Sequence, residues 1–99
     1  MRTVLLLEND DVAPGELAGQ LEALGYAVHQ PRTLLEARRQ KPTEFSVVVT
    51  DLRVAGGLGT DLIPWSQGTP VLVLASDATI RTAVDVMKLG AAEFLPRPF

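Results

Sequence analysis

The sequence contains no cysteine, which excludes disulfide bonds, thiolate catalysis and cysteine-based zinc sites. It contains a single histidine, His29, so a metal site built from several histidines is excluded as well. No apolar run approaches the roughly 18 residues that a membrane-spanning helix needs, and the apolar run at residues 4–7 is too short for a signal peptide. We therefore expect a cytoplasmic protein that makes no membrane contact.

The sequence also lacks a large excess of either sign of charge. Nine basic residues stand against twelve acidic ones, which gives a net charge of −3 at pH 7. A protein that binds nucleic acid through its phosphates needs an excess of positive charge, so we expect no direct nucleic-acid binding. The 99 residues are 46% hydrophobic and 21% charged, which is typical of a globular chain with one modest core. We expect one domain over residues 1–99.

Short apolar runs without alternation predict the strands. Three of them occupy residues 4–7, 47–49 and 71–74, and they are rich in leucine and valine. Unbroken runs of this kind are typical of strands buried on both faces of a parallel sheet. Two weaker candidates lie at residues 27–29 and 93–95.

Segments with helical spacing of apolar residues separate these strands. Leu17, Leu21 and Leu24 form one stripe, which ends before Gly25. Residues 34–39 and 60–63 predict two short helices, and Pro64 limits the second to one or two turns. The fourth predicted helix carries an apolar stripe at Ile80, Ala83, Val84 and Met87. Alternation of strand and helix predicts an α/β fold, an open parallel sheet with helices on both faces.

Polar residues follow two of the strongest strands. Glu8, Asn9 and Asp10 come directly after the first strand, and Asp51 comes directly after the third. If these strands are neighbours, the acidic side chains repel one another unless a cation lies between them, and their oxygens suit Mg²⁺. The alternative is that acids here cap helices, and Asp10 or Asp11 could cap the first one.

Four segments in order resemble a receiver domain of bacterial two-component response regulators. They are residues 4–10 (VLLLEND), 47–59 (VVVTDLRVAGGLG), 71–76 (VLVLAS) and 89–99 (LGAAEFLPRPF). The last segment resembles the nitrogen-regulatory type of the family. The resemblance covers the whole chain and implies a flavodoxin-like, doubly wound parallel sheet of five strands in the order 2-1-3-4-5.

The resemblance also implies a mechanism. A histidine kinase or a phosphotransfer protein supplies a phosphoryl group to Asp51, the implied phosphoacceptor. Mg²⁺ is held by the acidic residues after the first strand, by Asp51 and by the backbone carbonyl of Arg53. The signal then passes through the fourth helix and fifth strand to an output domain or a partner protein. The resemblance also implies a homodimer that forms through the fourth helix and the fifth strand.

The chain departs from the family's pattern at several positions. The acidic pair reads Glu8-Asn9, so one negative charge is missing and Mg²⁺ is expected to bind weakly. A shift of one residue, which makes Asn9-Asp10 the pair, is a minor alternative.

At the positions implied to contact the phosphoryl group, the hydroxyl residue is replaced by Ala75, with Ser76 next to it. The lysine is replaced by Arg97, which is not its geometric equivalent. Phe94 fills the aromatic switch position. Asp51 is unchanged.

Three functions stay open from the sequence. One is an atypical receiver that is phosphorylated at Asp51. A second is a phosphorylation-independent interaction module in which Arg97 holds Asp51 in an ion pair. A third, remote one is a small flavodoxin-like protein that binds FMN or a nucleotide. The sequence also ends just after the fifth strand, without the family's last helix. We therefore expect the N-terminal part of a longer regulator, with one face of its sheet partly uncovered.

Overall fold

A computed structural model of the chain describes residues 2–9, 15–76 and 79–97. Its centre is a parallel sheet of five strands in the order β2-β1-β3-β6-β7. The strands are β1 (Thr3–Leu7), β2 (Ala27–His29), β3 (Val47–Asp51), β6 (Val71–Ala75) and β7 (Glu93–Pro96). Since β6 and β7 are the fourth and fifth strands of the large sheet, the predicted order 2-1-3-4-5 is confirmed.

Apolar side chains fill both faces of this sheet, because alternate residues of a strand point to opposite sides. On one face Leu5, Val48 and Val73 are completely buried. On the other face Val4 and Leu74 pack together and are almost completely buried. The unbroken apolar runs of the sequence are thus explained by burial on two sides.

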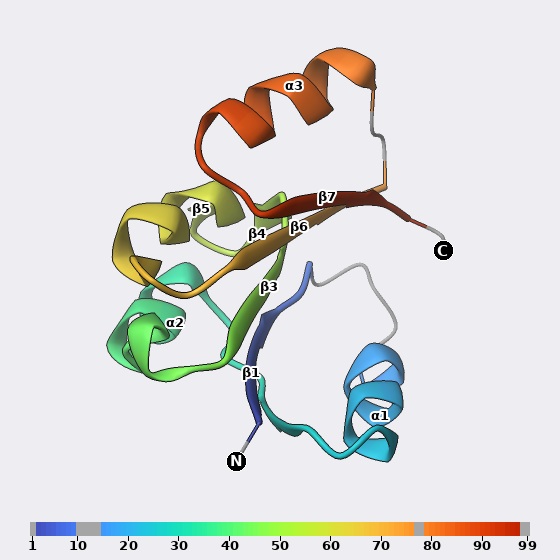
Figure 1. Ribbon diagram of the computed structural model, residues 1–99, viewed down its shortest axis with the longest axis vertical. Coiled ribbons are helices and arrows are strands. Elements are labelled where there is room, and N and C mark those ends of the chain that lie inside the picture. Colours follow the sequence, from blue (N-terminus) through green and yellow to red (C-terminus); the bar gives the residue numbers. More distant parts are fainter. Residues whose placement is uncertain (1, 10–14, 77–78, 98–99) are drawn as a thin grey trace.

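Helices cover the two faces unequally. Figure 1 shows α1 (Glu16–Ala23) on one side of the sheet and α2 (Leu34–Arg39) on the other. The second side also carries the 3₁₀ helices η1 (Pro42–Glu44) and η2 (Gly59–Ser66), and α3 (Ile80–Lys88) lies near β7. In the part of the chain that the structure describes, no helix is long and apolar enough to cross a membrane.

The predicted stripe of the first helix is correct for two of its three leucines. Leu17 and Leu21 of α1 pack against the core, whereas Leu24 is 71% exposed. The reason is that the helix ends at Ala23, and the chain reverses through Gly25, whose φ is +96°.

The fourth predicted helix is α3, but most of its apolar stripe does not face the core. Ile80 is 86% exposed, Val84 46% and Met87 44%, while Val86, outside the stripe, is the buried residue of the helix. The physical reason lies in the position of α3 near β7 (Figure 1), where only one narrow side of the helix meets the core. The apolar stripe therefore forms an exposed face.

On the side of the sheet that α1 covers, apolar surface is partly exposed. Leu95 of β7 is 38% exposed and Leu72 of β6 is half-buried. Among the described residues, the helix whose side chains pack on this face is α1, through Leu17 and Leu21. The partial exposure agrees with the expectation drawn from the sequence.

A small hairpin that was not predicted follows β3. Its strands are β4 (Arg53–Val54) and β5 (Gly57–Leu58), which pair antiparallel, and Gly56 between them has a φ of +100°. The chain leaves β5 directly into η2 at Gly59.

Candidate functional site

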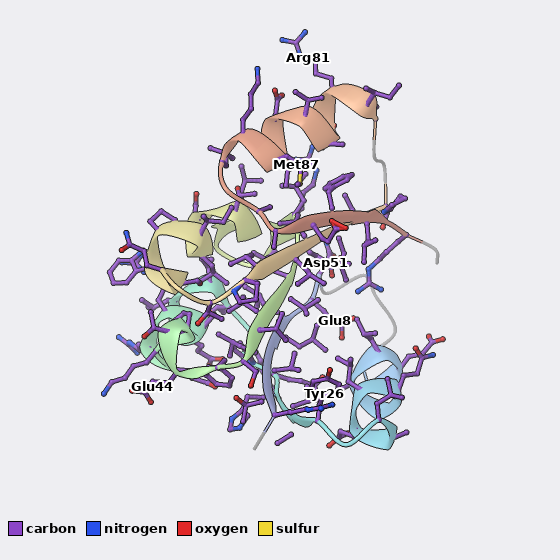
Figure 2. The ribbon with its side chains drawn as sticks, viewed as in Figure 1. Glu8, Tyr26, Glu44, Asp51, Arg81 and Met87 are labelled. Atoms are coloured by element: carbon purple, nitrogen blue, oxygen red, sulfur yellow. The ribbon has the colours of Figure 1, made fainter. Side chains whose placement is uncertain are left out.

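Three strands bring polar side chains to one edge of the sheet. Glu8 and Asn9 follow β1, Asp51 is the last residue of β3, and Arg97 follows β7. The carboxyl ends of parallel strands meet at the same edge, which is where open α/β sheets place their sites. Figure 2 shows the side chains of Glu8 and Asp51 at this edge.

Arg97 joins the two carboxylates. Its Nε donates a hydrogen bond to Oδ1 of Asp51, and its Nη2 donates one to Oε2 of Glu8, both at 2.9 Å. The side chains of Arg97, Glu8 and Asp51 are only 15%, 12% and 5% exposed. Hydrogen bonds between ionised groups are stronger than neutral ones, and partial burial limits their screening by salt. One guanidinium thus holds two carboxylates from strands that are neighbours in the sheet.

Asn9 makes two further contacts at this edge. Its backbone N–H donates to Oδ2 of Asp51 at 2.7 Å, and its side-chain Nδ2 donates to the carbonyl oxygen of Arg53 at 2.9 Å. Both oxygens of the Asp51 carboxylate therefore accept a hydrogen bond, one from a charged side chain and one from the backbone.

The backbone around Asp51 is held from several sides. The Thr50 hydroxyl donates to the carbonyl oxygen of Asp51 at 2.9 Å, and the N–H of Leu52 donates to the carbonyl of Leu74 at 2.7 Å. The N–H of Gly59 donates to the carbonyl of Leu52 at 2.8 Å. A side chain at Gly59 would collide with the carbonyl of Asp51 and the hydroxyl of Thr50. The close approach of η2 to β3 thus requires glycine at this position.

The other residues singled out in the sequence lie near this edge or outside the described residues. Ala75 is buried at the end of β6, and its carbonyl accepts the N–H of Arg97 at 2.8 Å. Ser76 is exposed, and Phe94 is half-buried against the core. Asp10 lies outside the residues that the structure describes.

The oxygen atoms at this edge match a hard divalent cation in type. Among the described residues no group of three or more histidine, aspartate or glutamate side chains is placed to hold a metal. Among the described residues, the Asn9 amide and the Arg53 carbonyl are the oxygen donors that could join the carboxylates of Glu8 and Asp51 around a cation. These donors fit such a cation in chemical type, while in the structure Arg97 binds both carboxylates and the NH₂ group of Asn9 binds the carbonyl.

Several of these contacts were not predicted from the sequence. The ion pair of Arg97 with Asp51 was weighed as a hypothesis, but that of Arg97 with Glu8 was not. The bond from the backbone N–H of Asn9 was also missed. The acidic residues after the first and third strands could have indicated that they share a basic partner. The sequence alone does not say which basic residue lies close enough to be that partner.

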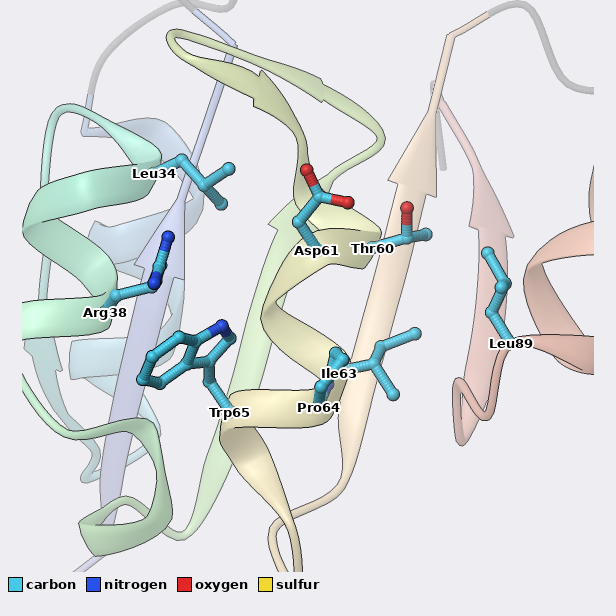
Figure 3. Close-up of a pocket in the computed structure, with 8 residues that line it drawn as sticks. All are labelled: Leu34, Arg38, Thr60, Asp61, Ile63, Pro64, Trp65 and Leu89. Atoms are coloured by element: carbon cyan, nitrogen blue, oxygen red, sulfur yellow. The ribbon is translucent and has the colours of Figure 1, made fainter.

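A cavity of about 410 Å³ lies apart from these residues, between α2 and η2 (Figure 3). The guanidinium of Arg38 stacks over the Trp65 ring, with its central carbon 3.9 Å from the ring centroid. Leu34 and Leu89 add apolar walls, and Asp61 adds a carboxylate. Trp65, which lies in η2, thus packs against Arg38 of α2.

Known proteins similar to this chain are response regulators. The acid tolerance regulatory protein ActR of Rhizobium meliloti is 32% identical over 104 residues, which cover 98% of this chain and 53% of ActR. The chain thus spans about half the length of the curated relatives that it matches. No family model matches the sequence.

Solved structures agree with this relationship. A response regulator of Burkholderia pseudomallei, solved with a phosphorylated aspartic acid, a calcium ion and citrate, is 33% identical with a TM-score of 0.86. The match covers all of this chain and 61% of that one. The beryllofluoride-activated NtrC4 receiver domain dimer is 31% identical with a TM-score of 0.87, and 86% of that chain is covered. The chain therefore belongs to the receiver domains of two-component response regulators.

Proposed function

We propose that this receiver domain accepts a phosphoryl group on Asp51 from a histidine kinase or a phosphotransfer protein in the cytoplasm. The observation that carries the proposal is the position of Asp51. It is a buried carboxylate at the carboxyl end of the central strand β3, beside a second carboxylate and an arginine. The Burkholderia relative, which carries a phosphorylated aspartic acid, supports it.

In the proposed transfer, a carboxylate oxygen of Asp51 attacks phosphorus and the bond from phosphorus to the donor's imidazole nitrogen breaks. The donor leaves as neutral imidazole after taking up a proton, and Asp51 becomes an acyl phosphate. Arg97 must first release Oδ1 of Asp51. Its guanidinium then lies close enough to pair with the new phosphoryl oxygens, because its fork of donors matches phosphate geometry.

Glu8, Asp51, the Asn9 amide oxygen and the Arg53 carbonyl are the proposed ligands of a divalent cation, and Asp10 is a further candidate. A bound Mg²⁺ would neutralise charge on the transferring phosphoryl group. The pair Glu8-Asn9 supplies one negative charge, so we expect weak binding. The calcium ion in the Burkholderia relative supports a divalent cation in this family.

The test of phosphorylation is the intact mass of the chain after incubation with acetyl phosphate and Mg²⁺. We expect the mass gain of one phosphoryl group, which is lost in Asp51→Asn. The matched control is Asp85→Asn, since Asp85 is exposed on α3, and it should be phosphorylated like the wild type. No mass gain in the wild type, or an undiminished gain in Asp51→Asn, would reject Asp51 as the acceptor.

The comparisons do not favour the two other functions. The similar proteins with stated roles are regulators, and the Burkholderia relative contains a phosphorylated aspartic acid. The acidic residues after β1 also oppose the binding of a free phosphate group without a metal.

We further propose that the domain forms a homodimer through the exposed face of α3 beside β7, and that this face also reaches an output domain or partner protein. Ile80, Val84 and Met87 give α3 an apolar face, which includes a shallow groove. The NtrC4 relative, which is a dimer when activated by beryllofluoride, supports this proposal.

A further inference from the structure

We infer that Arg97 is a tethered cation that competes with a divalent metal for the carboxylates of Glu8 and Asp51. The inference rests on the proposed function, because that function includes a metal at this edge of the sheet. It goes beyond that function by assigning Arg97 an inhibitory role toward the metal, besides its pairing with a phosphoryl group.

The competition follows first from charge. Glu8 and Asp51 contribute two negative charges and Arg97 one positive charge. The guanidinium lies 2.9 Å from an oxygen of each carboxylate. A divalent cation that shared these oxygens with Arg97 would bring two further positive charges next to the guanidinium in a partly buried site. A metal bound to the same oxygens would lie within a few ångströms of the guanidinium, and like charges this close repel strongly where water is largely excluded. The metal and Arg97 therefore exclude each other.

The competition follows secondly from the orientation of Asn9. Its Nδ2 donates to the Arg53 carbonyl, which is one of the proposed ligands. A metal binds oxygen lone pairs, so an amide that presents its NH₂ group occupies this carbonyl without serving as a ligand. Rotation of the amide by half a turn would expose its oxygen and release the carbonyl. In the structure, Arg97 thus binds the carboxylates of Glu8 and Asp51 while the NH₂ group of Asn9 binds the Arg53 carbonyl.

The consequence is a reduced apparent affinity for metal. Only the fraction of molecules in which Arg97 has left the carboxylates can bind the cation, and the apparent dissociation constant rises in proportion. By linkage, metal binding expels Arg97 to the same degree. Release of Arg97 is also what phosphoryl transfer to Asp51 requires, so one movement serves both events.

The test is a Mg²⁺ titration of the full chain followed by backbone amide NMR shifts. Arg97→Gln removes the competing charge, and Arg97→Lys keeps the charge without the fork that spans two carboxylates. Arg81→Gln is the control, because Arg81 is exposed on α3. We expect Mg²⁺ to bind at least about tenfold more tightly to Arg97→Gln, since two charge-assisted hydrogen bonds no longer have to break. Arg97→Lys should bind with intermediate affinity, and Arg81→Gln like the wild type.

Equal or weaker Mg²⁺ binding by both Arg97 variants would overturn the inference. If Arg97→Gln does not fold, Arg97→Lys decides by itself, because it retains a positive charge beside the carboxylates. Phosphorylation of Asp51 is scored separately by mass. Phosphorylation with unchanged Mg²⁺ affinity in the variants overturns the role of Arg97 alone. Tighter Mg²⁺ binding with no phosphorylation under any condition supports the role of Arg97 and overturns the proposed acceptor.

Discussion

The carboxylate of Asp51 shares its two oxygens between the guanidinium of Arg97 and the backbone N–H of Asn9. Each bond fixes one oxygen, so the carboxylate has a single orientation at the end of β3. Glu8 completes the arrangement through the other arm of the same guanidinium. At the scale of residues, the response of the site to metal or phosphate therefore depends on breaking these charge-assisted contacts.

Gly59 supports this site by steric means. Gly59→Ala would drive a Cβ into the carbonyl of Asp51 and the hydroxyl of Thr50, which are backbone and buried atoms that cannot yield cheaply. We expect a loss of about 2–3 kcal/mol in the free energy of unfolding, as for other overpacked sites. Urea denaturation measures it, and the backbone amide shifts of residues 50–52 should move.

The control for this prediction is Gly19→Ala. Gly19 lies within α1 and has open space where a Cβ would be added, so alanine should stabilise the chain by up to about 1 kcal/mol. If Gly59→Ala is as stable as the wild type, the close approach of η2 to β3 is not a constraint.

At the scale of elements, most of the apolar side chains of α3 are not buried. The apolar side chains of Ile80, Val84 and Met87 face outward, and Val86 is the side chain in the core. Thr79 caps the helix by accepting the N–H of Thr82 at 3.1 Å. The helix is thus well formed, while its apolar face is available for another surface.

Two substitutions in α3 distinguish its buried side from its exposed side. Val86→Ala should lower the free energy of unfolding by about 1–3 kcal/mol, because it leaves a cavity beside the core. Ile80→Gln should change it by less than about 0.5 kcal/mol, because that side chain is 86% exposed. Urea denaturation of both variants checks this, and a larger loss for Ile80→Gln would mean that the stripe faces the core in solution.

At the scale of the whole molecule, the sheet is covered unevenly. The strands β1, β3 and β6 lie inside the sheet, whereas β2 and β7 are its edge strands, and α3 lies beside β7. Exposed apolar side chains on α3 therefore gather at one end of the molecule, and contiguous apolar surface of this kind marks interaction sites.

The proposed homodimer gives a prediction at this scale. Sedimentation velocity of the chain in Mg²⁺ and beryllofluoride should show a dimer that grows with protein concentration, and Val84→Lys should abolish it by placing a charge in the apolar face. Leu24→Gln removes an exposed apolar side chain next to α1, away from α3, and it should leave the dimer intact. A dimer that survives Val84→Lys, or a wild type that stays monomeric, would contradict the proposed interface.

Much of the fold was predictable because its signals are local. Unbroken apolar runs such as residues 4–7 and 71–74 predict buried parallel strands, and the stop at Gly25 predicts the end of α1 to within two residues. Two features of the structure were not predictable in this way. The stripe of α3 predicted the helix but not its exposed face, because apolar residues on a helix do not say which surface covers them. The β4–β5 hairpin was missed, because each of its strands has only two residues.

The sequence by itself determined the alternation of strands and helices and placed Glu8, Asn9 and Asp51 after the strands whose ends meet. These are consequences of periodicity and chain order, which short segments carry. Only the tertiary structure decided that Arg97, 89 positions from Glu8, holds both carboxylates, and that Asn9 turns its NH₂ group toward Arg53. Such choices depend on distances between side chains from different strands, and those distances exist only once β1, β3 and β7 lie in one sheet.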